Sequence, residues 1–117
     1  MKWKKSEIIK KEQTFTEMIK TCPYVKNNYY VIYYQKNSNA TKYGISVPKK
    51  TGKANIRNKI KRRIKNIIDI NEKQVHKNYD YVIIVRKRLV ELNYREMELN
   101  LISLMKKIGA KNEEKKI

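Results

Sequence analysis

The segment GKANIRNKIKRRIKNII, residues 52–68, combines two kinds of side chain with a helical period. Its isoleucines recur at steps of four, four, three and one, which places them in a single stripe on a helix of about 3.6 residues per turn. The stripe consists of Ile56, Ile60, Ile64, Ile67 and Ile68. The same segment holds seven lysines and arginines and no acid. It therefore predicts a helix over 55–70 that buries its isoleucines and turns a purely cationic face outward.

This cationic face is unfavourable for the isolated helix. Like charges three or four residues apart destabilise a helix by roughly 0.2–0.5 kcal/mol per pair. Three such pairs are Arg57/Lys61, Lys59/Arg63 and Lys61/Lys65. Solvated helix faces usually mix charges of both signs, so contact with a polyanion explains this face better than solvation alone.

Positive charge is concentrated over the same part of the chain. The 117 residues contain 29 Lys and Arg against 11 Asp and Glu, a formal net charge of +18. Between Glu17 and Asp69 there is no acid, and these 51 residues hold 13 lysines and arginines. Such a concentrated positive surface is typical of a protein that binds nucleic acid or an anionic membrane.

The loop before the central helix belongs to this positive segment. Lys49, Lys50 and Lys53 surround Gly52, and a glycine lets the backbone approach a phosphate closely. The helix N-terminus that follows offers free amide groups. If about six cations of residues 49–65 contact phosphates, the affinity should fall roughly 10³-fold between 50 and 200 mM salt.

The rest of the composition sets limits on the class of protein. The single cysteine, Cys22, cannot form an intrachain disulfide, which fits a reducing compartment. Neither Cys22 nor the single histidine, His76, has the neighbours that a zinc site needs. No apolar run is long enough for a signal peptide or a membrane span, so we expect a cytoplasmic protein. The length suits one domain over residues 1–117, and the patterned apolar residues argue against disorder.

Three segments have the composition of β-strands. NNYYVIYYQ (27–35) and KYGISVP (42–48) flank a turn and are expected to pair as a hairpin. YDYVIIVRK (79–87) has a continuous apolar centre, which is typical of a strand buried on both faces.

A short helix is predicted before the strands, over residues 12–20. Phe15, Met18 and Ile19 share one side of it, and Cys22-Pro23 should end it because proline disfavours a helical residue before it.

A last helix is predicted over residues 94–108. Asn93 and Glu96 have the spacing of a capping box, and Gly109 is expected to end the helix. The tail of 110–117 is expected to fray. The predicted class is α+β, with the strands in one sheet and helices covering it.

The strand over 27–35 carries four tyrosines whose role the residues leave open. Alternation places Tyr29 and Tyr33 on one face and Tyr30 and Tyr34 on the other. If one face is exposed, its rings would stack on unpaired bases, at about 1–3 kcal/mol each. Alternatively all four simply pack, because tyrosine favours strands.

Residues 43–65, YGISVPKKTGKANIRNKIKRRIK, resemble the protein subunit of bacterial ribonuclease P. That family carries the pattern G-[IL]-S-V-S-K-K-x-G-N-A-V-x-R-N-[RK]-[IL]-K-R. The residues that match it are Gly44, Ser46, Val47, Lys49, Lys50, Gly52, Ala54, Arg57, Asn58, Lys61 and Arg62. IIKKEQTFTEMIK, NNYYVIYY and YDYVIIVRK also resemble segments of the family, so the resemblance covers nearly the whole chain.

The resemblance implies a specific fold. It is a single-domain α/β sandwich, with a mixed four-stranded sheet and three helices in the order αβββαβα. A left-handed βαβ crossover, which is rare, gives the arrangement called ribosomal protein S5 domain 2-like.

The resemblance also implies a function in removing the 5′ leader from precursor tRNA. The family's catalyst is a separate RNA with bound Mg²⁺, and the protein alone is inactive. The protein docks on that ribonuclease P RNA through its basic motif and holds the single-stranded leader in a cleft between the first helix and the sheet. No membrane and no obligatory protein partner are implied, no catalytic residue or metal site is expected in the protein itself, and the sequence does not reveal whether the protein binds a metal directly.

Two sets of site residues follow from the matching positions and the basic segment. The expected RNA contacts are Lys49, Lys50, Lys53, Arg57, Asn58, Lys59, Lys61, Arg62, Arg63 and Lys65. The expected leader cleft is lined by Phe15, Ile19, Tyr29 and Tyr33.

Four positions depart from the family pattern. Pro48 replaces a serine, Lys53 an asparagine and Asn55 a valine in the central motif. Ile19 replaces a second aromatic residue of the first helix, and Tyr29 is the expected substitute for the lost stacking contact.

Two other classes of protein stay open at this point. A non-catalytic RNA-binding module, such as a ribosomal or ribosome-assembly protein, would carry the same charge. A protein of the membrane surface would need the isoleucine stripe to be exposed beside the cations. A self-sufficient nuclease is disfavoured, since no Ser/His/Asp set or paired carboxylates stand out.

Overall fold

The computed structural model describes residues 12–38 and 40–115. Within them the chain forms three α-helices and four strands, in the order that the resemblance implied. The elements are α1 (Glu12–Thr21), β1 (Tyr24–Lys26), β2 (Tyr30–Lys36), β3 (Lys42–Ser46), α2 (Ala54–Ile70), β4 (Tyr79–Val85) and α3 (Tyr94–Lys115). Three short 3-10 helices connect them, η2 (Lys49–Thr51), η3 (Glu72–Gln74) and η4 (Lys87–Glu91).

The four strands form one mixed sheet in the order β1-β2-β4-β3. β4 pairs antiparallel with β2, from Tyr30↔Val85 onward, and parallel with β3. The predicted burial of β4 on both faces is confirmed, since it occupies a central position. The predicted hairpin between 27–35 and 42–48 is wrong, because the more apolar β4 lies between the two segments and gains burial on both faces there.

The hairpin that does form joins β1 to β2 around Asn27. The Oδ1 atom of Asn27 accepts hydrogen bonds from the amides of Tyr29 and Tyr30, at 2.8 and 2.9 Å. Asparagine side chains commonly stabilise turns in this way. The turn explains why the strand predicted over 27–35 begins only at Tyr30, and why the three-residue β1 stands apart from it.

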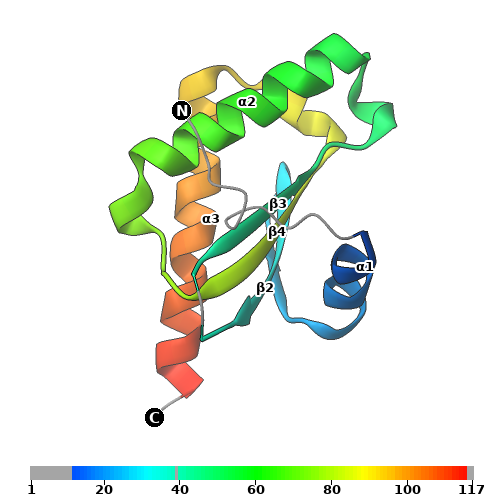
Figure 1. The fold of residues 1–117 in the computed structure, drawn as a ribbon. Coiled ribbons are helices and arrows are strands. Elements are labelled where there is room, and N and C mark those ends of the chain that lie inside the picture. The colour runs from blue at the N-terminus through cyan, green and yellow to red at the C-terminus, as the bar shows by residue number, and fades with distance from the viewer. Residues whose placement is uncertain (1–11, 39, 116–117) are drawn as a thin grey trace.

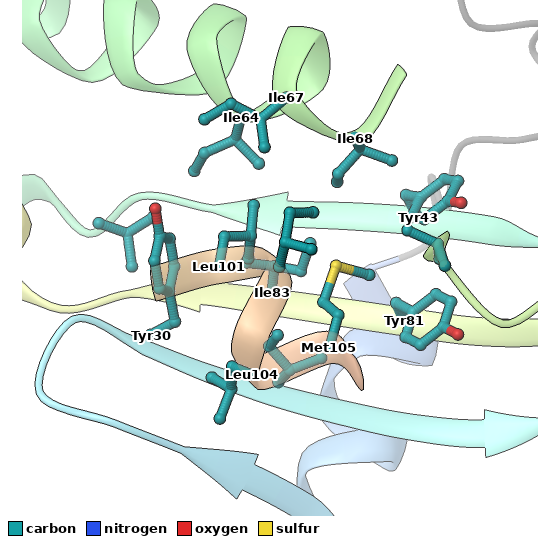
Figure 2. Close-up of a cluster of buried hydrophobic side chains, with 14 of the residues drawn as sticks. Tyr30, Tyr43, Ile64, Ile67, Ile68, Tyr81, Ile83, Leu101, Leu104 and Met105 are labelled. Carbon is teal, nitrogen blue, oxygen red and sulfur yellow. The ribbon is translucent and has the colours of Figure 1, made fainter. Parts of the chain in front are cut away.

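The sheet is covered unequally on its two faces. α2 and α3 lie on one face and the short α1 lies on the other (Figure 1). The large core fills the first face, where Ile64 and Ile67 of α2 and Leu101 of α3 are fully buried against Ile83 of β4 (Figure 2). Among residues 12–38 and 40–115, the small core under α1 has Met18 and Val82 as its buried members. The described elements therefore cover this face of the sheet only in part.

The helix predicted over 55–70 is confirmed as α2, and four of its five stripe isoleucines are buried in the large core. Ile56 is the exception: it is 41% exposed, so its predicted burial is wrong. It lies in the first turn of α2 and packs beside Gly52, where an added Cβ would be 3.3 Å from Ile56 Cγ2. The burial of the other four removes the exposed stripe that a membrane-surface protein would need.

Both ends of α3 can be compared with their predictions. The capping box is confirmed: the Asn93 amide donates to Glu96 Oε1 at 3.0 Å, and the Glu96 amide donates to Asn93 Oδ1 at 2.9 Å. The predicted end at Gly109 is wrong, since the helix continues to Lys115. A glycine costs a helix only about 1 kcal/mol, so it does not force an end. Fraying of 110–117 stays a prediction, and residues 116–117 lie outside the described part.

α1 agrees with its predicted helix, and Cys22-Pro23 follows its end as expected. The Cys22 amide makes the last helical bond, to Met18 O at 2.9 Å.

Among the described residues, no helix is both long enough and apolar enough to cross a membrane.

Candidate nucleic-acid interface

The predicted RNA contacts lie on one continuous stretch of structure, from η2 through the first three turns of α2. We call this stretch the cationic surface, and its charged members are Lys49, Lys50, Lys53, Arg57, Lys59, Lys61, Arg62, Arg63 and Lys65. Five of them are exposed and four are half-buried; Asn58 is exposed among them. The buried isoleucines fix the opposite side of α2 on the sheet, so the cations are held on a rigid support.

The charges of this surface are largely uncompensated. Ion pairs elsewhere in the described chain, such as Lys77–Glu72 and Arg88–Glu91, are exposed and 3.9 Å long. No cation from Lys49 to Arg63 forms an ion pair with a described acid. The first turn of α2 contains no acid, and its N-cap residue, Lys53, makes no side-chain cap bond. The free amides of the helix start therefore add to the positive potential.

Arg57 links the loop to the helix. Its Nε donates to Gly52 O at 3.1 Å, and its backbone amide donates to Lys53 O. The two terminal nitrogens of the guanidinium group make no hydrogen bond with a described residue. Arg57 thus stabilises the loop through Nε and leaves the two terminal nitrogens of its guanidinium group available for a phosphate.

A second surface lies on the partly open side of the sheet, beside α1. We call it the open face, and its half-buried members are Phe15, Val31, Tyr33, Ser46 and Ile84. Phe15, Tyr33 and Ile84 pack around the small core of Met18 and Val82. The predicted grouping of Phe15 with Tyr33 is thus found in the structure, and both side chains are half-buried, so part of each remains accessible.

The other two residues of the predicted cleft differ from this pair. Ile19 is 42% exposed on α1, and its contribution to the cleft stays a prediction. Tyr29 packs against the large core, on the opposite side of the sheet. Its predicted place beside Tyr33 is wrong, because the turn at Asn27 puts Tyr29 before β2 and outside the strand alternation. Tyr30 and Tyr34 are buried, so packing accounts for those two rings.

Phe15 sits directly on the backbone of β3 at Gly44. A Cβ atom at Gly44 would clash with Phe15 Cζ and would lie 2.9 Å from Phe15 Cε2, far closer than van der Waals contact. The glycine of the central motif therefore provides the space in which the Phe15 ring is seated on the sheet.

Replacing Gly44 by alanine is expected to push the Phe15 ring away and to lower the free energy of unfolding by about 1–3 kcal/mol. Adding Phe15→Leu, which shortens the opposing side chain, should recover part of that loss. Urea denaturation of the two single variants and the double variant gives the coupling between them. Strictly additive losses would show that the two positions do not compete for the same space.

Sequence reasoning missed a third group of cations, which follows β4. Arg86, Lys87 and Arg88 are exposed, and together with Pro48, Lys50 and Ile84 they line a hollow of about 270 Å³. Lys50 belongs to the cationic surface and Ile84 to the open face, so the two surfaces meet at this hollow. The Arg-Lys pair was visible at the end of YDYVIIVRK, but only the sheet order brings it next to Lys50.

Over residues 12–38 and 40–115, no three His, Cys, Asp or Glu side chains gather closely enough to hold a metal ion.

Comparison with known proteins gives one consistent result. A family model described as ribonuclease P matches residues 3–109. The ribonuclease P protein component of Mycoplasma capricolum is 43% identical over 107 residues, covering 90% of this chain and 98% of that protein. The corresponding protein of Streptococcus agalactiae is 39% identical and covers 91% and 97%. The solved structure of the RNase P protein from Thermotoga maritima superposes with a TM-score of 0.80 at 31% identity, covering 86% of this chain and 96% of that one.

Proposed function

This chain belongs to the ribonuclease P protein family and is the RNA-binding component of that ribonucleoprotein in tRNA processing; we propose that it works through two surfaces with separate RNA partners. The cationic surface docks on the ribonuclease P RNA. The open face binds the single-stranded 5′ leader of precursor tRNA.

The docking of the ribonuclease P RNA is supported above all by the uncompensated charge from Lys49 to Arg63. In the free protein these cations only repel one another. Against an RNA backbone they neutralise phosphates and release counterions, which favours binding. The rigid attachment of α2 through Ile64 and Ile67 means that little ordering is needed when the RNA binds.

The binding of the leader is supported by the composition of the open face. Single-stranded nucleic acid is typically held by accessible rings on which bases stack and by cations that follow the backbone. Phe15 and Tyr33 are half-exposed rings on this face, and Arg86 and Lys87 stand at its end. Lys50 at the shared hollow would place a cation where the leader on the open face comes next to the ribonuclease P RNA on the cationic surface.

The chemical step is assigned to the RNA partner. Magnesium ions bound by the ribonuclease P RNA would supply the activated water that cleaves the phosphodiester 5′ to the mature tRNA. The side chains of this protein reduce phosphate repulsion and hold the leader in place, so the protein alone should cleave nothing. A cytoplasmic site of action is part of the same proposal.

Reconstitution tests this function directly. The protein is mixed with the ribonuclease P RNA of the same organism and with precursor tRNA that carries a leader, and cleavage is followed at low magnesium. We expect the protein to stimulate cleavage and to raise the affinity for precursor tRNA over that for mature tRNA, because only the former has a leader. Binding of the RNA without any stimulation would contradict the proposal and favour a non-catalytic RNA-binding module.

A further inference from the structure

Tyr24 is an exposed aromatic residue that no motif of the sequence singled out. It lies on β1, the edge strand, and is 46% exposed. It stands directly opposite Tyr33 in the β1–β2 register. The centroids of the two rings are 5.3 Å apart and their planes are inclined at 47°. The open face therefore carries a pair of rings at its β1 side.

The direction of the β1 side chains follows from its middle residue. Val25 is buried in the large core, so its neighbours Tyr24 and Lys26 point to the other face of the sheet. Lys26 is exposed and stands opposite Val31. A ring pair and a lysine thus occupy the edge of the open face.

The strand registers join this edge to the rest of the open face. Lys26 is opposite Val31, Val31 is opposite Ile84, and Ile84 is opposite Ser46. These four residues form a row that crosses all four strands and leads toward Pro48 and the hollow beside the cationic surface. With neighbouring strands about 4.8 Å apart, the row is roughly 14 Å long.

The charge along this row suits a polyanion. Asp80 is the one acid within the four strands. Its carboxylate already accepts hydrogen bonds from Gln35 Nε2 at 2.9 Å and Asn37 Nδ2 at 2.7 Å. Asp80 also lies four residues from Ile84 on β4, roughly 13 Å along the strand, so the row itself contains no carboxylate.

We infer that Tyr24 and Tyr33 together form a stacking platform for a base of single-stranded RNA, with Lys26 contacting an adjacent phosphate. This inference rests on the proposed function and extends the leader site to the β1 edge. The ribonuclease P RNA, to which the chemical step is assigned, is proposed to dock on the side of β3, and β1 is the opposite edge of the sheet, so a leader must cross the sheet to reach Tyr24. α1 supplies one described ring, Phe15, so Tyr24 joins Tyr33 as the second ring that the strands contribute to this site.

If Tyr24 only stabilised the sheet, replacing it would have a different effect on substrate binding than if Tyr24 contacted the leader. A cross-strand tyrosine pair stabilises a sheet by roughly 0.2–1 kcal/mol, and that contribution does not depend on the substrate. A stacked base contributes only when the leader is long enough to reach it. Leader length is therefore the variable that separates the two roles.

The test uses the reconstituted holoenzyme and two precursor tRNAs, one with a long leader and one with a leader too short to reach β1. Tyr24→Thr removes the ring and keeps a residue that favours strands; Tyr24→Phe keeps the ring. We expect Tyr24→Thr to bind the long-leader substrate roughly 5- to 150-fold more weakly, as for loss of one stacked base, and the short-leader substrate unchanged. Tyr24→Phe should match the wild type with both. Leu99→Ala is the control, since Leu99 is 60% exposed on α3, which packs on the other face.

The outcomes separate this inference from the function on which it rests. If the wild-type holoenzyme binds both substrates equally, the leader-binding function fails. If it prefers the long leader and Tyr33→Ala abolishes that preference while Tyr24→Thr leaves it intact, only the role of Tyr24 is overturned. The role of Tyr24 would also be overturned if Tyr24→Thr weakened the binding of both substrates equally and lowered the unfolding temperature of the protein.

Discussion

Replacing Lys61 and Arg62 together by glutamate is expected to weaken binding of the ribonuclease P RNA by on the order of 10²-fold at about 0.1 M salt, because each lost phosphate contact is worth roughly tenfold there. The slope of log affinity against log salt concentration should become shallower by about 1.8 for the two contacts. Arg62 is exposed, Lys61 is half-buried, and neither has an acidic partner among the described residues.

The same double variant should not lose stability. A carboxylate at position 61 would stand four residues from Arg57 and four from Lys65, and it would turn two repulsive pairs into attractive ones. Each such pair contributes roughly 0.2–0.5 kcal/mol. The free energy of unfolding is therefore expected to stay constant or to rise slightly, in the opposite direction to the change in affinity.

Lys106→Glu with Lys107→Glu is the matched control for this prediction. Both lysines are exposed on α3, and the change in net charge is the same. Filter binding across a salt series, together with urea denaturation, gives affinity and stability for both variants. If the control lost as much affinity and as much salt slope, net charge and not the cationic surface would account for binding.

The features that the sequence predicted well are those set by neighbouring residues. The period of the isoleucines and the absence of acids both lie within α2, so its bounds, its buried side and its cationic side could be derived together. The capping box of Asn93 and Glu96 is equally local. The burial of Ile56 was predicted wrongly because the isoleucine pattern does not show where the sheet beneath α2 ends.

The features that the sequence did not predict depend on distant pairing. Nothing in residues 27–48 shows that β4 will enter between β2 and β3, so the strands next to each other in sequence were paired wrongly. The side of the sheet against which Tyr29 packs depends on where β2 begins, and the turn at Asn27 sets that starting point. A three-residue strand such as β1 gives too short a pattern to recognise, and Tyr24 was missed with it.

The candidate site shows the same division. The cationic surface is one stretch of sequence and was foreseen residue by residue. The hollow that joins it to the open face combines Lys50 with Arg86 and Lys87, which are brought together by the parallel pairing of β3 with β4. The seating of Phe15 on Gly44 is likewise a contact between α1 and β3 that no local pattern contains.

Ile64→Ala is expected to lower the free energy of unfolding by about 2–5 kcal/mol, because it leaves a cavity between α2 and the sheet. Ile64 has no exposed surface and points from α2 into the large core (Figure 2). Domains of this size are typically stable by only about 5–15 kcal/mol, so the loss is a large share of the total. Ile70→Ala on the same helix is the control: Ile70 is 59% exposed, and its loss should stay within about 0.5 kcal/mol.

Folded Ile64→Ala protein should nevertheless bind the ribonuclease P RNA with wild-type affinity, because every cation of α2 is still present. For an RNA that binds the folded state alone, a concentration of about 100 times the dissociation constant should restore roughly 2.7 kcal/mol of apparent stability. The charge-reversed variant should show the converse, normal folding and little stabilisation by RNA. Calorimetric unfolding with and without RNA separates the two cases. If fully folded Ile64→Ala protein bound RNA as poorly as the charge-reversed variant, the two sides of α2 would not have the separate roles on which the docking proposal depends.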